Sequence, residues 1–450
     1  MKEFVHSALL TALPPVILFC GTYFFIYLRG FFVLHPIKTA RLMFSGKSKL
    51  RELSVSLAGA LGVGNIVGVA VAISLGGAGA VFWMCAAAFV TMSLKYCEIL
   101  LAVRYRRARN GDFFGGPMYY MRDGVGGRTG KTLAAIFSAF GLFGSVVMGN
   151  IVQTGAAVSS VKEAIGIPKA VTGAIFCAVC LLVVMGGFTG ISKFTSVAVP
   201  VMSALYIGFS VYALIYRREF IPTALNNIFS SAFGTDAMAG GIFGFLFSPA
   251  VKQGVGKGAY SNEAGGGTAP MAHAGADAIS PAAQGTLGLF EVFFDTVLMC
   301  TLTALVILTS GVPTGGGGTE LVITAFSVSC GPVAKYVIAI SVMIFALSTV
   351  ICWAHYGTTC LEYFTSGKKT RKIYLLGYCF SVMIGAFMAE DVAWELSDMC
   401  VATMTLVNVF SVVLLRRKVK AETDVTFGQK PGENRAAGLA PLRAEYKKSR

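Results

Sequence analysis

Long apolar runs recur along almost the whole chain, and they constrain its fold more than any other feature. We count eleven runs, each close to the roughly twenty residues that a helix needs to cross a bilayer. In lipid a segment must satisfy its own backbone hydrogen bonds, so such runs predict helices. The expected fold class is an all-α integral membrane protein with about 11 transmembrane helices. The runs lie near residues 7–33, 52–75, 79–103, 132–160, 168–188, 193–216, 237–273, 282–310, 333–364, 372–389 and 393–415.

Charge is too scarce for a soluble protein of this length. Charged residues make up 13% of the 450 residues, against roughly 25% in soluble domains. The formal net charge of +15 does not indicate a nucleic acid partner, because basic residues gather between spans and after Leu415. Basic residues beside spans record topology and contact with membrane lipids. Their distribution predicts a multi-pass inner (plasma) membrane protein with its N-terminus outside and its C-terminus in the cytoplasm. It carries no signal of oligomeric state.

The order of the spans allows an internal repeat. An extra N-terminal helix would occupy residues 1–35, a first five-helix repeat 48–218 and a second repeat 236–416. Because each repeat holds an odd number of spans, the two would be inverted. Each repeat opens with a glycine-interrupted span, and paired interruptions mark the binding site of many transporters. The basic tail, residues 417–450, is expected to be cytoplasmic and disordered.

The first interruption reads Gly62-Val63-Gly64-Asn65 in the middle of an apolar span. A broken helix exposes backbone N–H groups at one end and carbonyls at the other, which suit a carboxylate and a cation. Close helix packing through the Gly64-xxx-Gly68 pattern is an equally good interpretation.

The second interruption lies within residues 257–270, which contain Ser261, Asn262 and Glu263 before three glycines. These polar residues can cap a helix or line a cavity. A cytoplasmic re-entrant turn is the alternative, and Gly240-Gly241 is a rival position for the break.

Ionisable groups inside spans are functional candidates, because lipid exposure of a charge is expensive. Asp295 is expected to coordinate or couple an ion, with Glu291 one turn away as a structural partner. Lys95 and Glu98 are expected to form a structural ion pair.

Polar side chains in two further spans remain ambiguous. Ser348 and Thr349 can complete a sodium site, because hard cations take oxygen ligands, or they can bond back to their own helix. Trp353, one turn on, can wall a pocket. Asn150 and Gln153 share a helix face and either join two helices or line a cavity.

Other function classes fit poorly. The chain has no GxxxxGK[ST] phosphate loop, no HExxH motif and no nucleophile–base pair, so we do not expect an enzyme. An ion channel is the alternative from a different class, but paired helix breaks favour alternating access.

Several stretches resemble the alanine or glycine:cation symporters. They include GVGNIVGVAVAISLGGAGAVFWM (62–84), KYCEILLAVRYR (95–106), KGAYSNEAGGGTAPMAHA (257–274) and STVICWAHYG (348–357), in family order. The resemblance implies a leucine-transporter-type 5+5 inverted repeat with two broken helices and one extra N-terminal helix. It implies uptake of a small neutral amino acid, alanine or glycine, coupled to Na+ or alternatively to protons. No organic cofactor is implied.

The same resemblance implies roles for individual residues. Asn65 and the Ala60 carbonyl would hold one sodium, while carbonyls of Ala58 and Leu61 with Ser348 and Thr349 would frame another. Three departures bear on substrate preference and ion stoichiometry: the family often has Thr at Val63 and Gly-Met-Gly at Gly265–Gly267, and Phe is usual at Tyr260. The candidate substrate-binding residues are Gly62, Val63, Gly64, Asn65, Gln153, Asn262 and Trp353, and the candidate sodium ligands are Ala58, Ala60, Leu61, Asn65, Asp295, Ser348 and Thr349.

Overall fold

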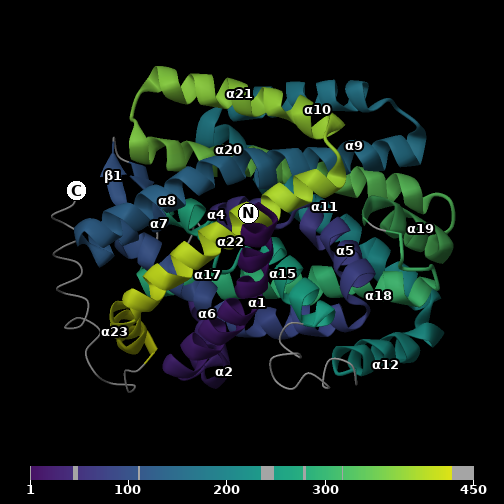
Figure 1. Ribbon diagram of the computed structural model, residues 1–450, viewed down its shortest axis with the longest axis horizontal. Helices are drawn as coiled ribbons and strands as arrows, with labels where there is room; N and C mark the ends of the chain where they lie inside the picture. Colours follow the sequence, from purple (N-terminus) through teal and green to yellow (C-terminus); the bar gives the residue numbers. More distant parts are fainter. Residues whose placement is uncertain are drawn as a thin grey trace.

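The computed structural model describes residues 2–43, 49–109, 112–234, 248–276, 280–316 and 318–427. This part of the chain is almost entirely helical (Figure 1). Its helices are α1 (Lys2–Tyr27), α2 (Phe31–Leu34), α3 (Pro36–Met43), α4 (Lys49–Ala60), α5 (Val67–Gly76), α6 (Gly79–Arg104), α7 (Pro117–Tyr119), α8 (Gly127–Val146), α9 (Val152–Ile165), α10 (Lys169–Val184), α11 (Gly187–Tyr216), α12 (Ile221–Ala232), α15 (Pro249–Asn262), α16 (Ala269–Ala274), α17 (Pro281–Val292), α18 (Thr301–Ser310), α19 (Gly318–Cys330), α20 (Ala334–Phe364), α21 (Lys368–Phe387), α22 (Glu390–Leu414) and α23 (Arg416–Phe427).

Irregular helical turns join several of these elements. A 3-10 turn, Val63–Asn65, follows α4, and another, Arg218–Phe220, precedes α12. Three π-helical turns are Tyr120–Val125 after α7, Val147–Ile151 between α8 and α9, and Phe293–Cys300 between α17 and α18. The strands β1 (Arg107–Arg109) and β2 (Asp112–Phe114) pair antiparallel, with Ala108 opposite Phe113.

The helices confirm the predicted integral membrane protein. Six helical stretches of the described residues are long and apolar enough to cross a membrane. They are α6, the continuous α8–α9 stretch, most of α11, the α17–α18 stretch, α20 and α22. The remaining predicted spans correspond to α1, α10, α21 and two interrupted helices. The helix boundaries follow the apolar runs because these segments have no other way to satisfy their backbone groups in lipid.

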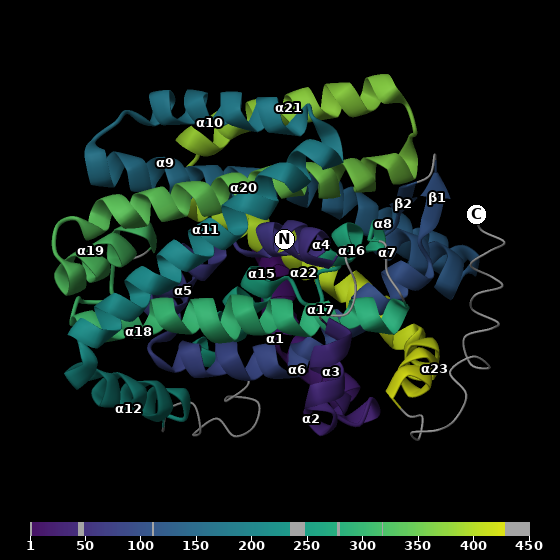
Figure 2. The same ribbon diagram turned by 180° about the vertical axis from the view of Figure 1, so that it is seen from behind.

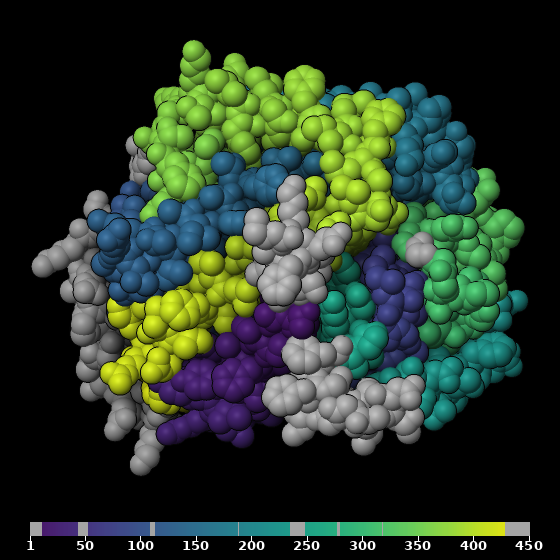
Figure 3. Space-filling view, in the orientation of Figure 1, coloured from purple at the N-terminus to yellow at the C-terminus, as the bar shows by residue number. Residues whose placement is uncertain are grey.

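The helices pack in layers around the two interrupted segments. Figure 1 shows α10 and α21 as an outer layer beyond α9 and α20. Figure 2 shows α17 and α18 running in line beside α6 on the opposite side. In Figure 3, α22 forms a diagonal band beside α1. The interrupted helices therefore lie inside the bundle rather than against lipid.

Both interruptions are real breaks in helices. α4 ends at Ala60, and α5 begins only at Val67 after a bend and the 3-10 turn. α15 ends at Asn262, and α16 begins at Ala269. The second break therefore spans residues 263–268, within the interruption predicted at residues 257–270. The rival position at Gly240-Gly241 lies outside the described residues.

The tail begins differently from the prediction. The sequence predicts a disordered tail over residues 417–450, but its first residues, 417–427, lie in α23, whose Phe427 ring lies 4.5 Å from that of Phe31. Tyr96 on α6 also bonds Thr423 at 3.0 Å. α23 is therefore anchored on the bundle by apolar and polar contacts, which a charge count alone cannot reveal. Residues 428–450 lie outside the described part of the chain.

Candidate functional site

A buried pair, Asn65 and Asp295, joins the first break to the α17–α18 stretch. Asn65 Nδ2 donates to Asp295 Oδ1 at 2.7 Å and to the Asp295 carbonyl at 3.0 Å. The Asn65 carbonyl accepts from Thr303 Oγ1 at 2.8 Å. Asp295 lies on the π-helical turn Phe293–Cys300, and Asn65 ends the 3-10 turn, so both side chains come from irregular backbone. The structure thus brings together two candidate ion ligands that lie 230 positions apart.

Hydroxyl groups complete the surroundings of the Asp295 carboxylate. Ser261 Oγ and Thr296 Oγ1 each donate to Asp295 Oδ2 at 2.8 Å. Ser261 belongs to the last turn of α15, immediately before the second break. One buried carboxylate therefore contacts both broken helices. Carboxylate, amide and hydroxyl oxygens are the ligands that hard cations prefer.

Gln153 holds the opposite side of the first break. Its Oε1 accepts from the Val63 backbone N–H at 3.0 Å, and its Nε2 lies 3.4 Å from the Tyr260 hydroxyl. A Cβ on Gly62 would lie 2.7 Å from Gln153 Oε1 and 2.8 Å from Thr349 Oγ1. Gly62 is therefore required for this close approach. The Tyr260 hydroxyl bond would be absent with the phenylalanine usual in the resembling family.

Thr349 binds the carbonyl end of α4. Its Oγ1 lies 3.0 Å from the Ala58 carbonyl and 3.3 Å from the Leu61 carbonyl. Ser348, the neighbouring candidate, donates instead to the Phe345 carbonyl at 2.8 Å. The Ala60 carbonyl accepts from the Gly62 N–H at 2.8 Å. Of the two hydroxyls predicted to face the exposed carbonyls, Thr349 does so in this arrangement and Ser348 bonds within its own helix.

Trp353 binds Glu263, which the sequence analysis gave as a possible helix cap or cavity-lining residue but not as a substrate or sodium ligand. Trp353 Nε1 donates to Glu263 Oε1 at 3.0 Å, and Thr268 Oγ1 donates to Glu263 Oε2. Glu263 is buried in the second break and lines a small cavity. The available signal was a charged residue two positions before the glycine triplet Gly265–Gly267 in an apolar stretch. The other lining residues are Met148, Ala259, Gly266, Thr268, Trp353, Val401 and Met404.

Asn262 lies beside the second break but holds helices together. Its Nδ2 donates to Thr296 Oγ1 at 2.9 Å, and its carbonyl accepts from Lys95 Nζ at 2.8 Å. The expected pair between Lys95 and Glu98 is wrong: Lys95 lies 3.9 Å from Glu291 instead. Lys95 projects toward the second break and α17, which a count of positions along α6 does not show.

Two further polar contacts distinguish structural from cavity-lining groups. Glu291 accepts from His273 at 2.6 Å, in agreement with a structural role. Asn150 Nδ2 donates to the Tyr378 carbonyl on α21 at 2.7 Å. Asn150 therefore bonds a neighbouring helix, while Gln153 faces the first break. The π-helical turn Val147–Ile151 shifts the helix phase between these two positions, so their side chains contact different neighbours.

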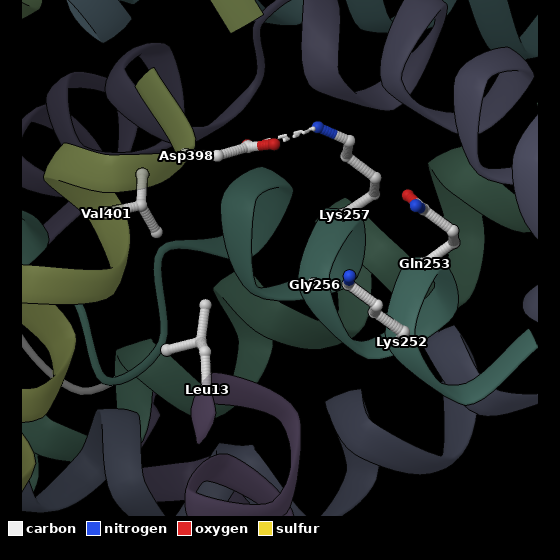
Figure 4. A pocket seen from close by; sticks show the side chains of 7 residues that line it. All are labelled: Leu13, Lys252, Gln253, Gly256, Lys257, Asp398 and Val401. Atoms are coloured by element: carbon white, nitrogen blue, oxygen red, sulfur yellow. Dashed lines mark hydrogen bonds and ion pairs between the residues drawn. The ribbon is translucent and has the colours of Figure 1, made fainter. Parts of the chain in front are cut away.

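An ion pair lies beside this centre. Lys257 Nζ on α15 lies 3.0 and 2.9 Å from the two carboxylate oxygens of Asp398 on α22 (Figure 4). Lys257 also lies 4.3 Å from the centre of the Trp394 ring. Val401 lines both the pocket beside this ion pair and the cavity beside Glu263. Lys257 and Asp398 therefore stand next to the centre on the side of the α15 N-terminal half.

This architecture is that of a secondary transporter of the leucine-transporter type. The chain is similar to the structure of MhsT in complex with L-phenylalanine, with a TM-score of 0.61, 15% identity, and coverage of 88% of this chain and 92% of that chain. It is also similar to a manganese transporter of Eremococcus coleocola, with a TM-score of 0.52, 13% identity and coverage of 91% and 85%. At these identities the likeness establishes the fold, and it agrees with the predicted fold class.

Sequence relatives identify the family. The model of the sodium:alanine symporter family matches residues 1–436. The sodium/alanine symporter AgcS of Methanococcus maripaludis is 35% identical over 425 residues, which cover 91% of this chain and 93% of AgcS. The probable sodium/glutamine symporter GlnT of Bacillus subtilis is 33% identical over 390 residues, covering 86% and 80%. The chain belongs to the sodium:alanine symporter family, which is a family of transporters rather than enzymes.

Proposed function

We propose that this protein is a symporter that carries a small neutral amino acid, alanine or glycine, together with Na+. The observation that carries the proposal is the meeting of both broken helices at one buried carboxylate. Asp295 accepts hydrogen bonds from Asn65 on the first break and Ser261 beside the second. A cation bound there would hold the two breaks in one arrangement. Binding of substrate and of ion would then be coupled.

Two sodium positions follow from the available oxygens. The first would use Asp295, the Asn65 amide oxygen and the Ala60 carbonyl. The second would use Thr349 with the Ala58 and Leu61 carbonyls, and Ser348 after a change of rotamer. These oxygen donors suit an alkali cation, and they come from the break and from the two helices that pack against it.

The substrate would bind across the first break. Its carboxylate would meet the N–H groups of the Gly62–Asn65 segment, where the helix dipole favours negative charge. Gln153, Tyr260 and Trp353 crowd the adjacent space. This crowding favours a side chain no larger than a methyl group and disfavours the larger substrate named for GlnT.

Transport would proceed by alternating access around this site. With the N-terminus outside and the C-terminus in the cytoplasm, as the basic loops predict, the Lys257–Asp398 pair would lie on the extracellular side. The pair would close the outer path while the site opens inward. Each repeat would then rock around the fixed centre. We propose that the two repeats are residues 48–218 and 236–416.

Uptake of radiolabelled alanine into proteoliposomes tests the proposal directly. We expect accumulation that saturates with alanine and requires an inward sodium gradient, with competition by glycine but not glutamine. A proton gradient applied without sodium is the second arm. Accumulation driven only by protons would replace sodium in the proposal, and flux without accumulation would favour a channel.

A further inference from the structure

Glu263 occupies an unusual backbone conformation. It caps α15 with φ of +54°, in the left-handed region that glycine adopts most readily. Among the described residues, only Arg29 and Glu263 combine a positive φ with a side chain. Such strain persists where the surrounding structure enforces it, and it gathers at binding sites. The carboxylate is therefore held in place by the second break itself.

The Glu263 carboxylate is buried without a cationic partner. Only 3% of the residue is exposed, and its oxygens accept hydrogen bonds from two neutral donors, Trp353 and Thr268. Among the residues that the structure describes, no Lys, Arg or His forms an ion pair with it. Lys95 on the adjacent helix is engaged by the Asn262 carbonyl and lies 3.9 Å from Glu291. The charge of Lys95 acts on Glu263, but at a longer range than an ion pair. A buried carboxylate whose direct partners are neutral is expensive, so this position suits a cationic group of a ligand.

The cavity beside Glu263 indicates which cation belongs there. Apart from Thr268 and Trp353, its lining is apolar, and Glu263 is its only charged residue. Met148, whose carbonyl accepts from Gln153, and Trp353, which donates to Glu263, both line it, so the cavity adjoins the residue that binds the first break. A zwitterion whose carboxylate binds at the first break would place its ammonium group toward the second. A methyl group would fit the apolar remainder of this lining.

We propose that Glu263 binds the ammonium group of the transported amino acid. This inference rests on the function proposed above and adds a residue to it. The ammonium would donate to carboxylate lone pairs that Trp353 and Thr268 leave free, since a carboxylate offers about four acceptor positions. The two broken helices would then hold opposite ends of one zwitterion. An amino acid would be selected over a 2-hydroxy acid of the same shape.

The test compares Glu263→Gln with wild type in purified protein. Equilibrium binding of alanine, of lactate and of sodium alone is measured for each. Glutamine preserves the shape and removes the charge, so we expect alanine affinity to fall about a hundredfold. Sodium affinity should stay within about threefold, because the ammonium position is separate from the ion ligands. The preference for alanine over lactate should largely disappear.

Glu98→Gln is the matched control. Glu98 is an equally buried carboxylate that Asn408 binds, and it does not line the cavity. Alanine affinity should change by less than about threefold in this variant, because the charge is removed away from the ligand. A loss as large as that in Glu263→Gln would mean that any buried charge matters equally, and would overturn the proposal.

Other outcomes are also decisive. Wild-type alanine affinity in Glu263→Gln would show that the carboxylate is protonated when substrate is bound, and would overturn the proposal. An unchanged preference for alanine over lactate would do the same. If Glu263→Gln does not fold, Glu263→Asp replaces it, because aspartate keeps the charge on a shorter side chain. Alanine should then bind more weakly, while binding of lactate and of sodium should not change. Failure of the wild type to bind any small neutral amino acid would instead refute the proposed function.

Discussion

Replacement of Thr349 by Val tests the sodium site at the carbonyl end of α4. Valine keeps the branched shape and removes the oxygen that lies 3.0 Å from the Ala58 carbonyl and 3.3 Å from the Leu61 carbonyl. We expect weaker sodium binding in a folded protein, with less alanine bound at any given sodium concentration. Raising sodium should restore alanine binding, because the two ligands are linked.

The magnitude follows from the bonds that each state loses. Without sodium, the variant loses one hydroxyl–carbonyl hydrogen bond, a net loss of about 1 kcal/mol. With sodium, it loses an oxygen that faces a charge, worth about 1.5–3 kcal/mol. The difference, roughly 0.5–2 kcal/mol, weakens sodium binding by a factor of roughly 2 to 30. Binding of radioactive sodium to purified protein measures this factor.

Thr358→Val provides a control on the same helix. Thr358 is also buried, and its hydroxyl donates to the Ala354 carbonyl of its own helix at 2.7 Å. Its loss should leave sodium affinity within about twofold, because no carbonyl of the broken helix is affected. Sodium affinity in Thr349→Val that is equal to this control would refute the assignment of Thr349 as a ligand.

Three further substitutions test the substrate pocket, the Lys257–Asp398 ion pair and the turn that contains Asp123. Gly149→Ala would place a methyl group against the Trp353 ring and should weaken alanine binding at least tenfold. Gly377→Ala, which faces open space, should not weaken it. Equal alanine affinities in the two variants would exclude Trp353 from the pocket. Asp398→Asn removes the partner of Lys257 and should speed modification of a Val401→Cys thiol by an impermeant reagent several-fold. Glu362→Gln, which breaks an exposed ion pair, should leave the rate unchanged. An unchanged rate in Asp398→Asn would show that the Lys257–Asp398 pair does not close the outer path to the site. Burial raises the pKa of Asp123, in the π-helical turn Tyr120–Val125, but hydrogen bonds from Arg122 and Arg107 outweigh it and lower the pKa below the ordinary 3.8. Asp123→Asn should therefore lower the melting temperature slightly at pH 7, and the difference from wild type should shrink as pH falls below 3.8; a difference that grows on acidification would contradict this.

The sequence was sufficient to predict the membrane fold and the first break. Apolar run length fixes the spans, because lipid leaves few alternatives, and glycines mark Gly62–Asn65 as a weak point in a helix. Asn65 and Asp295 were each identified as polar residues that lipid cannot accommodate. Their direct contact was not predictable, because it depends on how two helices far apart in sequence pack together.

Other features escaped because they depend on an irregular turn or on partners from other helices, neither of which residue spacing reveals. Regular helical spacing would place Asn150 and Gln153 on one face, yet the π-helical turn beside them directs the two side chains to different neighbours. Lys95 and Glu98 have the spacing of an ion pair, but buried groups on α17 and α22 bind them separately. Spacing along one helix predicts an ion pair only where water, and no buried group of another helix, competes for the two side chains.

The polar residues of the centre share one physical property, which is that each lies on or beside irregular backbone. Asn65 ends a 3-10 turn, Glu263 begins the second break, and Asp295 lies within a π-helical turn. Irregular backbone in a membrane must find partners within the protein, and side chains that supply them become fixed in direction. The same groups can exchange those partners for an ion or a zwitterion. The two carboxylates among them, Glu263 and Asp295, accept from the neutral donors Trp353 and Asn65 in this structure, and under the proposed function each would exchange such a donor for a cation.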